Sequence, residues 1–425
     1  MRRLNHPRSV VTLWKRISFL IASVTFLLTL CSTGWGLDDE SILHTFTDEN
    51  GDGSQPLGGV VFDKAGNLYG TTWGGGQYQS GAIYELSPNA EGGWTEQVIY
   101  SFTGGNDGTS PTAGLAIDQL GNLYGSTKFG GSESKGTVFE LSPTPNGWAF
   151  NLIYTFTGGD DGAYPSAALT LDASGNIYGT AFEGGAHSVG TAFTLQLNSG
   201  HWEFSLLHTF TGGKDGGYPS ANFIFDSVGN LYATTSYGGS GDSCYMGCGT
   251  VYELLPSSGG WHEKVLHNFN GGVSGSYPGG GLIFDSNGNL YGVAAGGGRH
   301  DEGIVYELLG TSGKWSYKSL YSFIGKPDGA SPDGSLVFDP EGNLYGTAGV
   351  GGVGFGTAFE LTPSAGKWDF VLLHTFYVEH SDGANPTGSL VLDAYGNLYG
   401  TAAGGGEPAA GLVFELSPPD PKMKR

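Results

Sequence analysis

One short motif, Gly-Asn-Leu/Ile-Tyr, constrains the fold of this chain more than any other feature. It occurs seven times, starting at Gly66, Gly121, Gly175, Gly229, Gly288, Gly342 and Gly396. The successive intervals are 55, 54, 54, 59, 54 and 54 residues. A period of this length indicates one supersecondary unit, repeated so that each copy buries its apolar face against its neighbours.

The sequence pattern of each repeat predicts four strands. The first is apolar and ends in Asp (residues 60–63), and the turn Asp-x-x-Gly-Asn follows, in which Gly66 supplies a positive φ. The second strand reads Leu-Tyr-Gly-Thr-Thr, and residues 136–141 and 148–156 exemplify the third and fourth. Gly accounts for 78 of 425 residues, which excludes a helix bundle because each helical Gly costs about 1 kcal/mol.

The fourth-strand motif, Leu/Ile/Val-aromatic/His-x-Phe, predicts how the array closes. It also occurs seven times, but its first copy (residues 43–46) precedes repeat one, and repeat seven stops after its third strand at Leu416. We therefore expect the N-terminal strand to complete the last unit and hide the open edge. The predicted fold is all-β: one seven-bladed β-propeller over residues 37–418, with a short tail at 419–425.

The N-terminal 36 residues have the order of a secretory signal peptide. Five Lys/Arg and no acid lie in residues 1–16, an apolar run covers 17–30, and small residues lead to Gly36. The apolar run is shorter than the roughly 20 residues that span a membrane. We expect cleavage near Gly36, no permanent membrane span afterwards, and a secreted or periplasmic protein. Lipidation at Cys31, a retained anchor and cell-surface association stay open as alternatives.

Without residues 1–36 the chain has 13 Lys+Arg against 40 Asp+Glu, a net charge of −27. Such a surface repels phosphates, so we expect no nucleic-acid partner, whereas cation binding is compatible with it.

The repeats resemble the GloVer tandem-repeat family of bacterial exported proteins. The resemblance rests on Asp-x-x-Gly-Asn-Leu-Tyr-Gly-Thr-Thr, Gly-Thr-Val-Phe-Glu-Leu, a Trp, and Tyr-Ser-Phe-Thr-Gly-Gly-x-Asp-Gly, and it covers nearly all of the mature chain. The core motif is also similar to NHL-type propeller repeats. The resemblance implies no settled activity.

Residues that recur in every repeat are expected to build the blade, and residues that break the pattern in loops are better functional candidates. The loop between blades, Gly-Gly-x-Asp-Gly, carries an Asp in six copies and Ser274 in the other. It is interpreted either as a turn or as an acidic ring for a cation. Asp48, Asn50 and Asp52 match the first half of a calcium loop, but the twelfth position is Gly59 instead of Glu. Calcium is therefore one hypothesis and a solvated turn the other, and no cofactor is expected to be required.

The loops after the second strands differ most between repeats and supply the ligand-binding candidates: Glu183, His187, Tyr237, Asp242, Tyr245, Arg299, His300, Asp301 and Glu302. Arg299 is the one Arg after residue 36 besides Arg425, and could hold a carboxylate in two hydrogen bonds. Cys244 and Cys248 predict a local disulfide, since two further zinc ligands are lacking nearby.

The favoured function is a non-catalytic binding or scaffold module for a glycan or a cell-surface protein, expected to be a monomer. The alternative is a glycan-active hydrolase or lyase using carboxylates on the loop-bearing face. A purely structural surface protein is the third hypothesis. The chain shows no nucleophile elbow or phosphate loop, so no catalytic residue is assigned.

Overall fold

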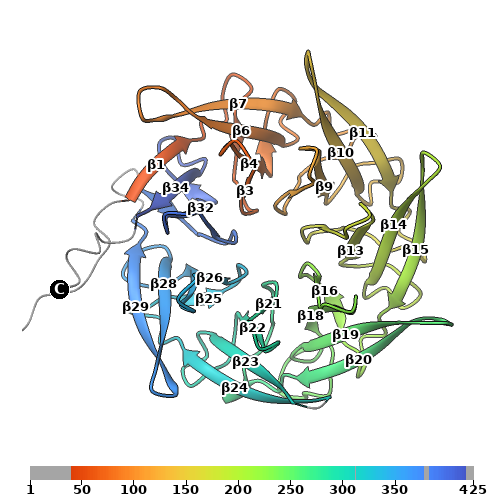
Figure 1. Cartoon of the computed structure of the whole chain (residues 1–425), viewed down its shortest axis with the longest axis vertical. Helices are drawn as coiled ribbons and strands as arrows, with labels where there is room; N and C mark the ends of the chain where they lie inside the picture. Colours follow the sequence, from red (N-terminus) through yellow and green to blue (C-terminus); the bar gives the residue numbers. More distant parts are fainter. Residues whose placement is uncertain (1–39, 312, 378–381, 418–425) are drawn as a thin grey trace, which may run out of the picture. The chain divides into compact units, whose positions relative to one another are not determined.

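The computed structural model describes residues 40–311, 313–377 and 382–417. Contacts divide the chain into residues 1–36 and 37–425. The predicted signal peptide and the tail at 419–425 lie outside the described residues. The described part of the second unit forms seven antiparallel blade sheets in a ring (Figure 1), which confirms the predicted propeller.

The strands of each blade run from the channel outward, and we number the blades by the repeat that forms them. The first strands are β3 (Val61–Phe62), β8 (Ala116–Ile117), β12 (Thr170–Leu171), β17 (Ile224–Phe225), β21 (Ile283–Phe284), β26 (Val337–Phe338) and β31 (Val391–Leu392). The second are β4 (Leu68–Thr72), β9 (Leu123–Thr127), β13 (Ile177–Ala181), β18 (Leu231–Tyr237), β22 (Leu290–Ala294), β27 (Leu344–Val350) and β32 (Leu398–Ala402).

The third strands are β6 (Ala82–Pro88), β10 (Thr137–Thr144), β14 (Thr191–Asn198), β19 (Thr250–Ser257), β23 (Ile304–Thr311), β28 (Thr357–Ser364) and β34 (Leu412–Leu416). The fourth are β7 (Trp94–Ser101), β11 (Gly147–Thr155), β15 (His201–Thr209), β20 (Gly260–Asn268), β24 (Lys314–Ser322), β29 (Lys367–Thr375) and β1 (Glu40–Thr45). Short pieces at the loops are β2 (Gly53–Ser54), β5 (Gly74–Gly75), β16 (Gly217–Pro219), the 3-10 turn η1 (Gly272–Ser274), β25 (Ala330–Pro332), β30 (Gly383–Ala384) and β33 (Gly404–Gly405).

Blade seven closes the ring as the sequence predicted. β1, the first described strand, pairs antiparallel with β34, so Glu40 lies opposite Leu416 and Thr45 opposite Leu412. Figure 1 shows β1, in red, beside the blue strands of the C-terminal end. The pairing covers the edge of β34 that would otherwise remain open.

The recurring Asp between the first and second strands caps its own turn. Asp63 Oδ1 accepts the N–H groups of Ala65 and Asn67 at 2.8 and 2.9 Å, and its Oδ2 accepts the Asn67 amide at 2.9 Å. Gly66 has φ +90°, the left-handed conformation that Gly adopts at little cost. Equivalent bonds are made by Asp118, Asp172, Asp226, Asp285, Asp339 and Asp393.

Blades pack through aromatic residues. The Tyr of a second strand meets the Trp of the next blade edge-to-face, as in Tyr69–Trp148 at 5.6 Å between ring centroids. The Gly of the second strand makes room for the third-strand ring: a Cβ at Gly125 would lie 2.5 Å from Phe139 Cζ. Phe139 and Tyr69 are buried and Trp148 is half-buried, and such rings form the core between blades.

The loops after second strands and the loops between blades lie on the same face of the propeller. β2 pairs with β5, Ala163 bridges Glu183, and Ser276 bridges Gly296. We call this side, which bears both sets of loops, the loop face. Within the described residues, no helix has the length and apolar character that crossing a membrane requires.

Candidate functional site at the channel mouth

A tripeptide from each blade lines the central channel. The seven tripeptides are residues 57–59, 112–114, 166–168, 220–222, 279–281, 333–335 and 387–389, and each follows a Pro. They are mostly Gly, Ala, Ser and Thr, and they enclose a cavity of about 360 Å³. The small side chains leave the channel open at its centre.

The residue before each Pro adopts a left-handed backbone conformation. These residues are Gln55, Ser110, Tyr164, Tyr218, Tyr277, Ser331 and Asn385, with φ between 52° and 59°. Bulky residues rarely adopt this conformation, and it persists only where surrounding bonds impose it. At Tyr277 the N–H donates to Cys248 O of the preceding blade at 2.9 Å, and the carbonyl accepts from Ala295 of its own blade at 3.1 Å. The strained residue is thus held by two blades at once.

A second cavity of about 350 Å³ lies at the mouth of this channel, on the loop face. Its lining includes aromatic residues of blades three to five, together with small polar residues of blades four to seven. The three aromatic residues that line it are Phe182, Tyr237 and Tyr277. Together with Tyr218 they form what we call the aromatic row, whose rings touch in sequence: Phe182–Tyr218 at 5.2 Å, Tyr218–Tyr237 at 5.3 Å and Tyr237–Tyr277 at 5.4 Å between ring centroids. The mouth therefore has one aromatic wall.

Asp333 of blade six lies where the two cavities meet, because it lines both. Its side chain is exposed to the cavity and makes no hydrogen bond or ion pair with the described residues. Protein nevertheless surrounds it, and this burial raises the pKa of Asp333 above its ordinary value. It is the one carboxylic acid among the described residues that line the mouth cavity.

Of the nine predicted ligand-binding residues, Tyr237 lines the mouth cavity and the other eight line neither cavity. His187, Asp242, Arg299 and His300 are exposed on loops, and Tyr245 is 85% exposed. Those eight remain candidates for a separate contact on the loop face.

The loop of blade five supports the mouth through its backbone. Asp301 Oδ1 accepts the Gly297 N–H at 2.9 Å, and the carbonyl of Glu302 accepts the N–H of Ser331. In blade three, the backbone of Glu183 exchanges hydrogen bonds with Ala163.

The predicted disulfide between Cys244 and Cys248 is present. Since the carbonyl of Cys248 accepts the N–H of Tyr277, the bridged loop helps to hold the last ring of the aromatic row. The insertion that lengthens blade four thus supports the mouth without entering it.

The Asp residues of the loops between blades serve as turn caps. Asp161 accepts the N–H of Thr157 at 2.7 Å and the hydroxyl of Tyr154 at 3.1 Å. In the candidate calcium loop, Asp52 accepts the N–H and hydroxyl of Thr47 and the N–H of Gly53. This carboxylate is therefore engaged within its own turn, while Asp48 and Asn50 have positive φ.

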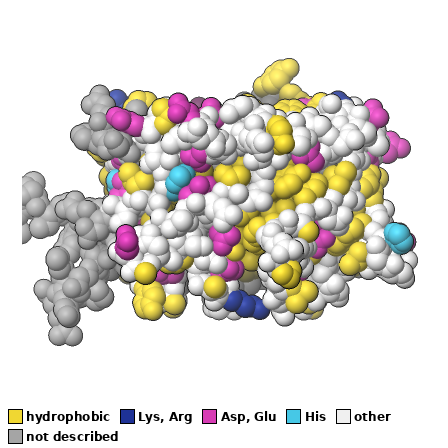
Figure 2. Space-filling model, turned by 90° about the horizontal axis from the view of Figure 1, so that it is seen from above, with side chains coloured by type: hydrophobic (Ala, Val, Ile, Leu, Met, Phe, Trp, Pro, Cys, Tyr) yellow, Lys and Arg dark blue, Asp and Glu magenta, His cyan; other side chains and the backbone are white. Residues whose placement is uncertain are grey.

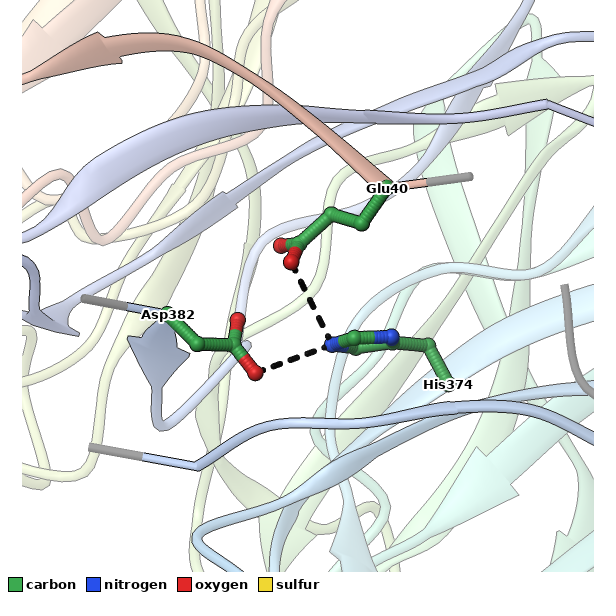
Figure 3. A group of neighbouring side chains, drawn as sticks. All are labelled: Glu40, His374 and Asp382. Carbon is green, nitrogen blue, oxygen red and sulfur yellow. Dashed lines mark hydrogen bonds and ion pairs between the residues drawn. The ribbon is translucent and has the colours of Figure 1, made fainter. Parts of the chain in front are cut away.

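At three of the interfaces between blades, one His, one Asp and one Glu form a cluster. Figure 3 shows one of them, in which Nε2 of His374 lies 3.1 Å from Asp382 Oδ2 and 3.6 Å from Glu40 Oε2. Burial raises the pKa of Glu40 to about 7, with His374 opposing the shift and Asp382 adding to it. The pKa of His374 is raised, chiefly by Asp382 against the effect of burial. The equivalent clusters are His44–Asp52–Glu96 and His208–Asp215–Glu263.

The sequence does contain a signal for the residues of the mouth that were not among the predicted candidates. Positions 164, 218 and 277 are Tyr where the other repeats have Gln, Ser or Asn, and Asp333 is the one acid in the seven tripeptides. Both break the repeat pattern, which was the criterion for a functional candidate. These positions precede the first strand of each blade, outside the variable loops after the second strands to which the sequence prediction was confined.

Comparison with solved structures finds similar folds at low identity. A putative 6-phosphogluconolactonase from Bacteroides uniformis is 14% identical, with a TM-score of 0.48, over 74% of this chain and 84% of that chain. A luciferin-regenerating enzyme is 16% identical, with a TM-score of 0.45, over 72% of this chain and 91% of that one. At this identity these likenesses concern the fold alone.

Comparison with curated proteins found no match. A family model does match: the Gloeobacter/Verrucomicrobia repeat covers residues 23–246 and 241–425. Those two ranges contain all seven repeats and the residues of the channel mouth. The chain belongs to the Gloeobacter/Verrucomicrobia repeat family.

Proposed function

We propose that this protein is a non-catalytic binding module, and that it binds a carbohydrate at the mouth of its channel. The aromatic row carries the proposal. Sugar rings present apolar C–H faces that stack on aromatic side chains. Neighbouring rings of the row are tilted by 56–78°, and the three that line the mouth, Phe182, Tyr237 and Tyr277, form the aromatic platform offered to a sugar. Ser331, Asn385 and Thr387, on the other side of the mouth, offer polar groups to hydroxyls.

The size and chemistry of the mouth favour binding over hydrolysis. A volume of about 350 Å³ is within the range of small-ligand pockets. Glycoside hydrolysis ordinarily uses two carboxyl groups at a defined separation. Asp333 has no carboxylate partner among the described residues of the mouth cavity.

A glycan array probed with the purified protein tests this function, followed by calorimetry on the best ligand. Tyr277→Ala and Tyr237→Ala should each weaken binding about tenfold or more, because each removes one ring of the platform. Tyr78→Ala is the matched control, since this Tyr lies in a loop after a second strand, is 52% exposed and is outside the aromatic row. Saturable binding that is indifferent to the aromatic row would refute the site, and turnover of a glycan would select the hydrolase or lyase alternative.

We also propose that the protein is exported. The Cys244–Cys248 disulfide is compatible with an oxidising compartment outside the cytoplasm. Mass spectrometry of protein recovered from culture medium and periplasm should find the chain starting near residue 37. A chain retained in the cytoplasm with residue 1 present would contradict the proposal.

A further inference from the structure

Among the seven channel tripeptides, Asp333 is the single charged residue. The equivalent first positions are Leu57, Thr112, Ser166, Ser220, Gly279 and Thr387. Within the described residues, the Asp333 carboxylate accepts no hydrogen bond, in contrast to the Asp residues of both repeated turns, which accept backbone N–H groups. A carboxylate that makes no hydrogen bond, at the one charged position of the tripeptides, therefore points to a ligand.

Among the described residues, no Lys, Arg or His forms an ion pair with Asp333. The mouth cavity has no Lys or Arg among its described lining residues. Lys128 of blade two lines the channel cavity together with Asp333, and its ammonium lies 5.5 Å from the Phe129 ring centroid. Acidic side chains are spread over the side of the propeller in Figure 2, with few basic ones in view. A cation in the mouth would thus be attracted by both the nearby carboxylate and the overall charge.

The aromatic row adds a second attraction for the same kind of group. The faces of Tyr and Phe carry negative potential, and ammonium groups bind over them. Tyr237 and Tyr277 line the same cavity as Asp333. A neutral sugar would use the rings and the polar groups of the mouth, whereas a positively charged ligand would use the carboxylate as well.

The neighbouring blade has space for this carboxylate because residue 279 is Gly. A Cβ at Gly279 would collide with Oδ1 of Asp333. The φ of Gly279 is not positive, so an Ala there would displace the carboxylate without straining its own backbone. Two variants can therefore be compared: Asp333→Asn removes the charge, and Gly279→Ala only moves it.

We infer that the mouth selects a ligand that carries an ammonium group beside a face that stacks on the aromatic row, such as an amino sugar. This inference rests on the proposed carbohydrate-binding function and names the class of sugar. Asp333 pairs with the ammonium, and Tyr237 and Tyr277 contact the same group or the ring next to it.

The test compares two matched pairs of probes by calorimetry at about 0.15 M salt, where distant charges are screened. The sugar pair is the β-1,4-linked glucosamine tetramer and its N-acetylated form. The charge pair is choline and its neutral isostere 3,3-dimethylbutan-1-ol. We expect the charged member of each pair to bind about tenfold to hundredfold more tightly, in the range of a charge-assisted contact.

Asp333→Asn should abolish both preferences without lowering the melting temperature, and Gly279→Ala should reduce them. Glu133→Gln, which removes an equal charge from an exposed loop of blade two, is the control and should change neither. Choline keeps its charge at every pH, so its affinity should fall as the pH drops through the titration of Asp333.

Each outcome decides one of the two proposals. If both tetramers bind equally well and Asp333→Asn has no effect, the ammonium inference is wrong and the carbohydrate function stands. If choline binds in an Asp333-dependent way but no glycan of the array binds, the ammonium site stands and the carbohydrate function is wrong. If none of the four probes binds, the ammonium inference is wrong, and the glycan array alone decides the carbohydrate function.

Discussion

Two kinds of blade interface use the same backbone positions for different chemistry. In one kind, a fourth-strand Tyr donates to the Asp of the following loop and stacks on a Phe of the next blade, as Tyr154 does with Asp161 and Phe204 at 4.5 Å. In the other, the Tyr is replaced by His and the Phe by Glu, as in His208, Asp215 and Glu263. The Asp is common to both.

The substitutions occur in pairs. Tyr100, Tyr154 and Tyr321 face Phe150, Phe204 and Phe370, whereas His44, His208 and His374 face Glu96, Glu263 and Glu40. His267 is the exception: Ser274 replaces the Asp, Tyr317 stacks on the imidazole at 4.3 Å, and burial lowers the pKa of His267 to about 4. A residue in one blade thus constrains its counterpart in the next. If only one residue of a pair changed, a buried polar group would lie against an apolar ring without a partner.

The largest effect should come from removing β1, which supplies His44 to one His-Asp-Glu interface and Glu40 to another. Deleting residues 41–47 should leave β34 with an exposed edge and disrupt two interfaces at once. We expect aggregation or loss of the cooperative melting transition, measured by calorimetry and light scattering. A truncated protein that melts like the intact one would refute the importance of this closure.

A double-mutant cycle tests the pairing directly. His208→Tyr and Glu263→Phe should each destabilise the protein by about 1–3 kcal/mol, because each leaves a mismatched partner. The double variant recreates the Tyr-Asp-Phe interface and should lie within about 1 kcal/mol of the wild type in urea unfolding. Additive losses would mean that the two positions are independent.

The His-Asp-Glu interfaces should also respond to pH. Burial raises the pKa of Glu263 to about 7, so between its ordinary pKa of 4.5 and 7 the folded state holds a proton that the unfolded state releases. The contribution of Glu263 to the free energy of unfolding therefore falls as the pH rises through that window. Glu263→Gln should be near neutral at pH 5 and stabilising by about 1 kcal/mol at pH 8, allowing for screening by solvent. Melting curves across the window measure the difference, and parallel profiles would contradict it.

The smallest effect is expected at the exceptional interface. Nε2 of His267 is buried without a hydrogen-bond partner. Ser274→Asp should supply the missing carboxylate and raise the pKa of His267 from about 4, as Asp382 does for His374. NMR titration of the imidazole reports this pKa directly. An unchanged value would show that stacking on Tyr317, and not the missing acid, decides it.

The repeat predicted the fold because its information is local. The interval between Gly-Asn-Leu/Ile-Tyr motifs, the Asp-capped turn and the displaced fourth-strand motif at residues 43–46 specify blades, turns and closure without any long-range contact. The disulfide was predictable for the same reason, since Cys244 and Cys248 are four residues apart. For the candidate site, this reasoning placed Tyr237 on the loop face but not the aromatic row as a whole.

By itself, then, the sequence determined the number of blades, the order of strands and the strand that closes the ring, because each of these depends on neighbours within one repeat or on counting repeats. Only the tertiary structure decided which side chains of different blades come into contact. Phe182, Tyr237, Tyr277 and Asp333 line one mouth but come from four different repeats, and the sequence separates each from the next by 40 to 56 residues. The curvature of the ring brings them to one mouth, and the same curvature sets Glu40 beside His374.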